Sequence, residues 1–150
     1  MKFILKFVLC LCGIIFWSNE DCFAQKLNST FEKISKLEGF QLLHYTAEEY
    51  GFPKEMGKMK MVCYGNADPR DKVLEILATI PQSLLKIDYW DDREKITRYY
   101  LEKDSNGNTF LMQTFIGQGG NDLCVWLFTG SSYEYYQKII QQVRTELKDQ

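Results

Sequence analysis

The sequence predicts an α+β domain in which an antiparallel sheet, with a C-terminal four-strand meander, packs against two or three helices. Three segments carry apolar residues at helical spacing behind residues that favour a helix start. From residue 85 to residue 128 the apolar period changes to two, and clusters of turn residues separate the runs. Helices grouped apart from consecutive antiparallel strands are typical of the α+β class.

The first 24 residues read as a secretory signal peptide. Lys2 and Lys6 form a short basic start, Phe7–Trp17 is an apolar core, and Cys22–Ala24 places small residues where a signal peptidase cleaves. The apolar run is too short to be a permanent membrane span. We therefore expect a soluble mature chain that begins at Gln25 and lies in the periplasm or is secreted.

Composition then limits the mature part to one domain. Removing the first 24 of the 150 residues leaves 126, which suits a single core, residues 25–150. The formal net charge is -2, so a nucleic acid is not an expected partner, because phosphate binding needs a concentrated basic face. The only basic cluster, Lys54, Lys58 and Lys60, is interrupted by Glu55 and is predicted to be a solvated edge.

The first half of the domain reads as helix, strand, connection and strand. Ser29–Glu32 matches a capping box and predicts a short helix that stops at Gly39. Phe40–Tyr45 follows as a strand, Thr46–Lys58 with its glycines and proline as a connection, and Met59–Tyr64 as a second strand.

A second helix is predicted from Asp68 and Pro69, which supply a capping carboxylate and a proline at the first helical position. Asp71 lies in the positive first turn, and Pro81 ends the helix. The apolar face has helical spacing: Val73, Leu74, Leu77 and Ile80.

Four runs then predict the strands of the meander: Leu85–Tyr89, Ile96–Lys103, Phe110–Ile116 and Leu123–Phe128. Ser105–Asn108 and Gly117–Asn121 are the predicted turns on either side of the third run. The last run is apolar on both faces, so we expect a central strand covered on both sides, with Trp126 buried.

A long helix completes the chain. Ser131–Glu134 reads as a second capping box. The buried stripe of this helix is predicted from residues at helical spacing: Tyr136, Ile140, Val143 and Leu147.

The layout resembles small exported domains of unknown function from Gram-negative gut bacteria. The likeness is carried by Phe31–Lys33 with Gly39 and Phe40, by the capped middle helix, by the Lys103–Asn108 hairpin, and by Leu127–Gly130 before the last helix. It covers nearly the whole mature chain. It implies an α+β fold and a periplasmic or secreted location, and it carries over no catalytic residue.

Two cysteines remain after signal cleavage, Cys63 and Cys124, each inside an apolar strand-like run. Two exported thiols can form one disulfide. Unpaired, each would behave as a small buried hydrophobic residue. The sequence leaves both readings open.

Few patterns in the sequence indicate a catalytic or metal-binding site. His44 is the only histidine, and the usual reading of one strand histidine is structural. The chain lacks the spacing of a zinc or phosphate-loop motif, so no metal or cofactor is expected. The enzyme alternative is a small exported hydrolase that uses His44 or acidic residues near Asp91.

Aromatic residues are in excess, and exposed rings favour contacts with a protein or a carbohydrate. The predicted binding residues are Tyr89, Trp90, Tyr133 and Tyr135. The alternative is that the rings pack on the sheet and leave only their hydroxyls in water. We therefore expect an exported, non-enzymatic binding or accessory protein of the bacterial envelope, with the hydrolase and a self-associating structural subunit as alternatives.

Overall fold

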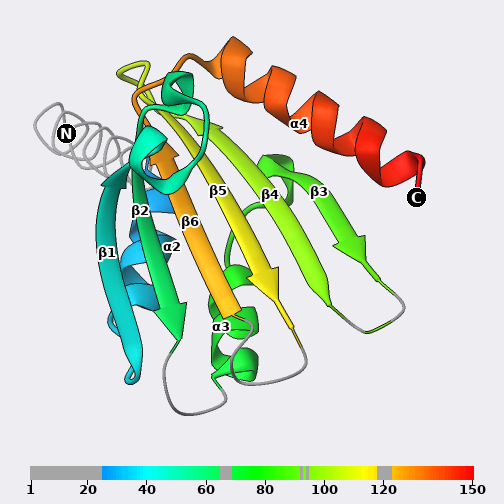
Figure 1. Ribbon diagram of the computed structural model, residues 1–150. Helices are drawn as coiled ribbons and strands as arrows, with labels where there is room; N and C mark the ends of the chain where they lie inside the picture. Colours follow the sequence, from blue (N-terminus) through cyan, green and yellow to red (C-terminus); the bar gives the residue numbers. More distant parts are fainter. Residues whose placement is uncertain (1–24, 65–68, 92, 94, 118–122) are drawn as a thin grey trace, which may run out of the picture.

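The computed structural model describes residues 25–64, 69–91, 93, 95–117 and 123–150, and within them it has the predicted α+β class (Figure 1). The signal peptide, Asp68 and all but Gly117 of the predicted Gly117–Asn121 turn lie outside these residues. The helices are α2 (Lys26–Ser35), α3 (Arg70–Leu77) and α4 (Tyr133–Lys148). The strands are β1 (Phe40–Thr46), β2 (Lys58–Tyr64), β3 (Leu85–Trp90), β4 (Ile96–Lys103), β5 (Thr109–Ile116) and β6 (Leu123–Thr129).

The six strands form one antiparallel sheet in the order β1-β2-β6-β5-β4-β3. Strands β3 to β6 are the predicted meander, and β6 returns to pair with β2, so the prediction that this apolar run is an inner strand is confirmed. The β1–β2 connection contains two short 3-10 helices, η1 (Glu48–Tyr50) and η2 (Lys54–Met56); a third, η3 (Gln82–Leu84), precedes β3. No helix among the described residues combines the length and apolarity needed to cross a bilayer.

Helices α2 and α3 cover one face of the sheet, behind it in Figure 1. Leu27, Phe31 and Ile34 of α2 are fully buried and pack in one cluster with Val62 of β2 and Val125 of β6. Both helices end earlier than predicted, at Ser35 and Leu77 rather than near Gly39 and Pro81. Side-chain burial is complete across the middle of this face.

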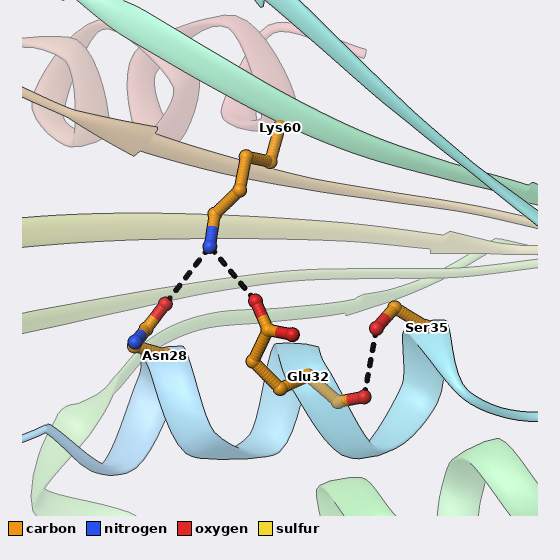
Figure 2. Close-up of polar contacts among 4 residues, drawn as sticks. All are labelled: Asn28, Glu32, Ser35 and Lys60. Carbon is orange, nitrogen blue, oxygen red and sulfur yellow. Dashed lines mark hydrogen bonds and ion pairs between the residues drawn. The ribbon is translucent and has the colours of Figure 1, made fainter.

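The start of α2 differs from the predicted capping box. The helix begins at Lys26, and the buried carboxylate of Glu102 accepts hydrogen bonds from the backbone N–H groups of Lys26 and Leu27, at 2.9 and 2.8 Å. Ser29 and Glu32 are therefore inside the helix. Figure 2 shows that Glu32 pairs instead with Lys60 of β2, whose Nζ is 2.9 Å from Glu32 Oε1.

Lys60 is correspondingly not the solvated side chain that we expected. Its ammonium group also donates to Asn28 Oδ1 at 3.1 Å and lies 5.3 Å from the ring centroid of Phe31 (Figure 2). The three contacts hold α2 to β2 through a cation that is only partly exposed.

Helix α4 lies on the opposite face, in front of the sheet in Figure 1. Its N-cap is Ser132, whose Oγ accepts from the Tyr135 N–H at 3.1 Å, so the cap is one residue later than the predicted box. Tyr136 and Ile140 are buried as predicted, whereas Val143 and Leu147 are only half-buried. The Tyr136 hydroxyl donates to the Met56 carbonyl at 2.8 Å and fixes the helix against η2.

Candidate functional site

Helix α4 covers only part of its face of the sheet. It packs against β4 and β3, and among the described residues no helix lies in front of the lower part of this face (Figure 1). The strand ends in this lower part are the start of β6 and β4 and the end of β2, β5 and β3. The two faces of the sheet are therefore covered unequally.

Two cross-strand rows of side chains occupy this region, because side chains alternate along each strand and the register aligns them across the sheet. The first row, from β1 to β3, is Gln41, Cys63, Cys124, Phe115, Thr97 and Tyr89. The second row, in the same order, is Leu43, Met61, Trp126, Gln113, Tyr99 and Ile87.

The half-buried members of these rows define what we call the open face: Leu43, Cys63, Cys124, Trp126, Gln113, Phe115, Thr97 and Tyr89. None of these side chains is a carboxylate, a lysine, an arginine or a histidine. The open face is thus an uncharged band of apolar, aromatic and thiol groups across the sheet, with Gln113 and Thr97 as its polar members.

Aromatic residues from the β1–β2 connection border the open face. Tyr50 of η1 is 43% exposed, and its ring lies 5.4 Å from that of Tyr45 and 6.0 Å from that of Phe52. Burial, followed by the nearby thiols of Cys63 and Cys124, raises the pKa of Tyr50.

Two charged side chains, Lys95 and Glu146, lie at the other border of the open face. Lys95 Nζ lies 5.8 Å from the ring centroid of Phe115. Burial raises the pKa of Tyr99, and the Glu146 carboxylate of α4 raises it further. A cation and a carboxylate at the border of an uncharged centre match the usual anatomy of a contact surface.

Trp126 is half-buried, so the prediction that it is buried was wrong. Both faces of β6 are apolar, but Trp126 points to the face that α4 leaves partly open. Its indole Nε1 is itself buried, with no hydrogen-bond acceptor among the described residues. A buried donor without an acceptor costs about 1–3 kcal/mol.

The four predicted binding residues do not form one patch. Tyr89 belongs to the open face, whereas Trp90, the next residue along β3, points to the other face, is 56% exposed and donates from Nε1 to Asp88 Oδ1 at 3.0 Å. Tyr133 and Tyr135 lie in the first turn of α4, far from this end of β3. Both are half-buried against the core, so our expectation that they are freely exposed was wrong.

Tyr133 lines a separate groove of about 760 Å³ along α4. Lys86, Gln137, Gln141 and Arg144 also line it, and Arg144 donates to the Lys86 carbonyl at 2.7 Å. The groove combines apolar and polar side chains, and the Arg144 guanidinium in it already has an intramolecular acceptor.

The structure does not bring His44 to either cysteine. His44 is exposed on β1 and points to the face opposite Cys63, into a pocket of about 420 Å³ lined also by Lys58, Lys60 and Thr129. Sequence spacing could not show this, because the faces follow from strand register.

Asp91 has a structural role in the β3–β4 connection. Its Oδ1 accepts from the N–H groups of Arg93 and Lys95, both at 2.9 Å, which caps the turn. Within the described residues no group of three or more histidine, cysteine, aspartate or glutamate side chains is placed to hold a metal ion.

Trp126, Phe115, Gln113 and Leu43 were not among the predicted site residues. The signal in the sequence was the alternation Cys124, Trp126 against Leu123, Val125, but both sets are apolar and neither indicates which face lacks a cover. Comparisons with protein-family models, with curated proteins and with solved structures find no match to this chain.

Proposed function

We propose that this chain is an exported, non-enzymatic binding protein of the bacterial envelope and that its partner contacts the open face. One observation carries the proposal. The residues of the open face are uncharged and half-buried, whereas the opposite face of the sheet is packed under two helices. An apolar sheet face is normally covered by another layer.

The composition of the open face favours a protein as the partner. The centres of protein contact surfaces are depleted of charge and enriched in aromatic side chains, and Trp126, Phe115 and Tyr89 meet that description. Carbohydrate sites combine aromatic rings with several hydrogen-bonding side chains, and Gln113 and Thr97 are the polar members here. A carbohydrate is therefore the second class of partner to test.

The indole N–H of Trp126 is buried, so what Trp126 offers to a partner is the accessible part of its ring. Gln113, opposite Trp126 on β5, supplies a polar group at the same level.

The export part of the proposal depends on residues 1–24 and has its own measurement. Mass spectrometry of the protein recovered from the cell envelope should find Gln25 at the N-terminus. Recovery of the uncleaved chain from the cytoplasm would contradict export while leaving the contact surface to be tested separately.

The contact surface is tested with two substitutions on it and one matched control. Gln113→Lys places a charge in the open face without creating a cavity, and Trp126→Ala removes its largest ring. Trp90→Ala is the matched control, because it removes a tryptophan side chain that is 56% exposed and lies on the opposite face of the sheet. Each variant is first shown to be folded by circular dichroism and thermal melting.

Protein partners are then recovered from an envelope extract and the same variants are applied to a glycan array. We expect a partner that wild type and Trp90→Ala retain and that Gln113→Lys and Trp126→Ala lose. A further variant, Tyr133→Ser, tests the groove along α4. If both open-face variants retain the partner and Tyr133→Ser loses it, the contact belongs to that groove instead. Binding to glycans alone would replace the protein by a carbohydrate.

A further inference from the structure

We propose that Cys63 and Cys124 form a reversible dithiol–disulfide site on the open face, which reacts with external disulfides by thiol–disulfide exchange. This inference does not depend on the proposed partner. It rests on register, on accessibility and on the geometry of antiparallel strands.

Register places the two cysteines directly opposite each other, Cys63 near the end of β2 and Cys124 near the start of β6. These two strands are neighbours inside the sheet (Figure 1). Opposed residues of antiparallel strands have Cα atoms about 4.5 or 5.5 Å apart. Both values lie within the range of about 4.4–6.8 Å that a disulfide spans. The two sulfurs also share a face, so no strand has to rotate for a bond to form.

Accessibility separates this pair from a disulfide closed inside a core. Both side chains are half-buried and both are present as thiols in this structure. They belong to the part of the sheet that α4 leaves uncovered. A small thiol or disulfide can therefore reach them without unfolding the domain.

Strand geometry argues that the bond is reducible. Opposed Cβ atoms on antiparallel strands are about 4.5–5.5 Å apart, whereas a relaxed disulfide holds its Cβ atoms at about 3.8 Å. Closing the bond draws β2 and β6 together at a point where the neighbouring ladders fix their separation. A disulfide formed under such tension is more easily reduced.

The reaction has two exchange steps. One cysteine thiolate attacks the external disulfide R–S–S–R, which forms a mixed disulfide and releases R–S⁻. The second cysteine thiolate then attacks the protein sulfur of the mixed disulfide, which forms the Cys63–Cys124 bond and releases the second R–S⁻. The two electrons pass to the external disulfide, and the two thiol protons are taken up by the released thiolates.

The test equilibrates the folded protein with oxidised and reduced glutathione in a series of ratios, followed by acid quench, alkylation and mass spectrometry of the peptides that contain Cys63 and Cys124. We expect wild type to lose the mass of two hydrogen atoms under oxidising ratios and to regain it under reducing ratios without unfolding. Cys63→Ser and Cys124→Ser should each accumulate a mixed disulfide with glutathione instead. A circular dichroism spectrum taken at each ratio establishes that the domain stays folded.

A trivalent arsenical, which bridges two adjacent thiols, gives an independent readout. Phenylarsine oxide should protect both Cys63 and Cys124 of the folded wild type from alkylation. In each single variant, the one cysteine that remains of this pair should not be protected. A disulfide that glutathione reduces only after denaturation would overturn the proposal and identify a permanent bridge. Thiols that neither reagent modifies in the folded protein would overturn it and identify two core residues.

Discussion

Glu102 links the first helix to the sheet, and its substitution tests how this fold begins. The side chain is 3% exposed, its Oε1 accepts from the Lys26 N–H at 2.9 Å, and its Oε2 accepts from the Leu27 N–H at 2.8 Å. These are first-turn amides that have no partner within the helix. Gln25, at the N-cap, makes no side-chain capping bond, so Glu102 replaces the local cap.

The cost of removing this carboxylate follows from the two bonds. A hydrogen bond to a charged acceptor contributes about 1.5–3 kcal/mol, and a carboxylate beside a helix N-terminus adds up to about 1–2 kcal/mol. Glu102→Gln keeps one neutral acceptor and turns an amide N–H₂ toward the other donor, so we expect a loss of about 2–4 kcal/mol. Glu102→Ala leaves both donors unsatisfied and should cost about 3–6 kcal/mol.

Urea unfolding and thermal melting followed by circular dichroism measure these losses, and Glu75→Gln, on the exposed side of α3, is the matched control. The control should stay within about 0.5 kcal/mol of wild type. The backbone amides of Lys26–Ser35 should exchange their hydrogens faster in Glu102→Gln than in wild type. In Glu75→Gln they should exchange at the wild-type rate. Equal stability of the two variants would refute the assignment of Glu102 as the cap of α2.

Three further substitutions test other parts of the structure. Gly57→Ala should cost at least about 2 kcal/mol more than Gly51→Ala by urea unfolding, because both glycines have φ near +90° but only at Gly57 would a Cβ meet a backbone oxygen, that of Thr129, at 2.2 Å; equal losses would contradict the contact. Burial raises the pKa of Asp104, but hydrogen bonds from the Asn108 side chain and from the N–H groups of Asn108 and Asn106 outweigh it, so the pKa lies below its ordinary value. The ionised form therefore stabilises the β4–β5 hairpin above about pH 4, and the stability gap between wild type and Asp104→Asn should be full near neutral pH and shrink as pH falls through the lowered pKa; a gap that widens in acid would contradict this sign. His44→Ala should stay within about 0.5 kcal/mol of wild type in thermal melting and should keep any bound partner, because the ring is exposed and points away from the open face; loss of the partner in this variant alone would favour the enzyme alternative.

Local sequence signals were sufficient to predict the strands. The period of two and the turn residues around Ser105–Asn108 depend on neighbours in the chain, and the observed strands differ from the predicted runs by a residue at their ends. The apolarity of Leu123–Phe128 on both faces also indicated its inner position. These features need no knowledge of distant residues.

The start of α2 could not be read locally, since the group that caps it is 76 residues from Lys26. Ser29 and Glu32 had the pattern of a capping box, but Lys60 of another element pairs with Glu32. A carboxylate from β4 and an ammonium group from β2 thus override the local preference for a capping box.

The open face could not be predicted from local sequence signals either. The sequence marks Trp126 as part of a strand apolar on both sides, and only the path of α4, fixed by the Tyr136 hydroxyl on the Met56 carbonyl, determines which side is left uncovered. The alignment of Cys63 with Cys124 likewise follows from β6 pairing with β2. Strand order and register are long-range properties that spacing along the chain does not contain.

Site-specific photo-cross-linking in the producing cells tests the proposed contact surface most directly. A benzophenone amino acid replaces Gln113 on the open face, Leu42 on the other face of β1, or Glu75 on α3, in three otherwise identical chains. We expect a discrete protein adduct from position 113 and none from positions 42 and 75. Adducts from position 42 or 75, with none from position 113, would contradict it.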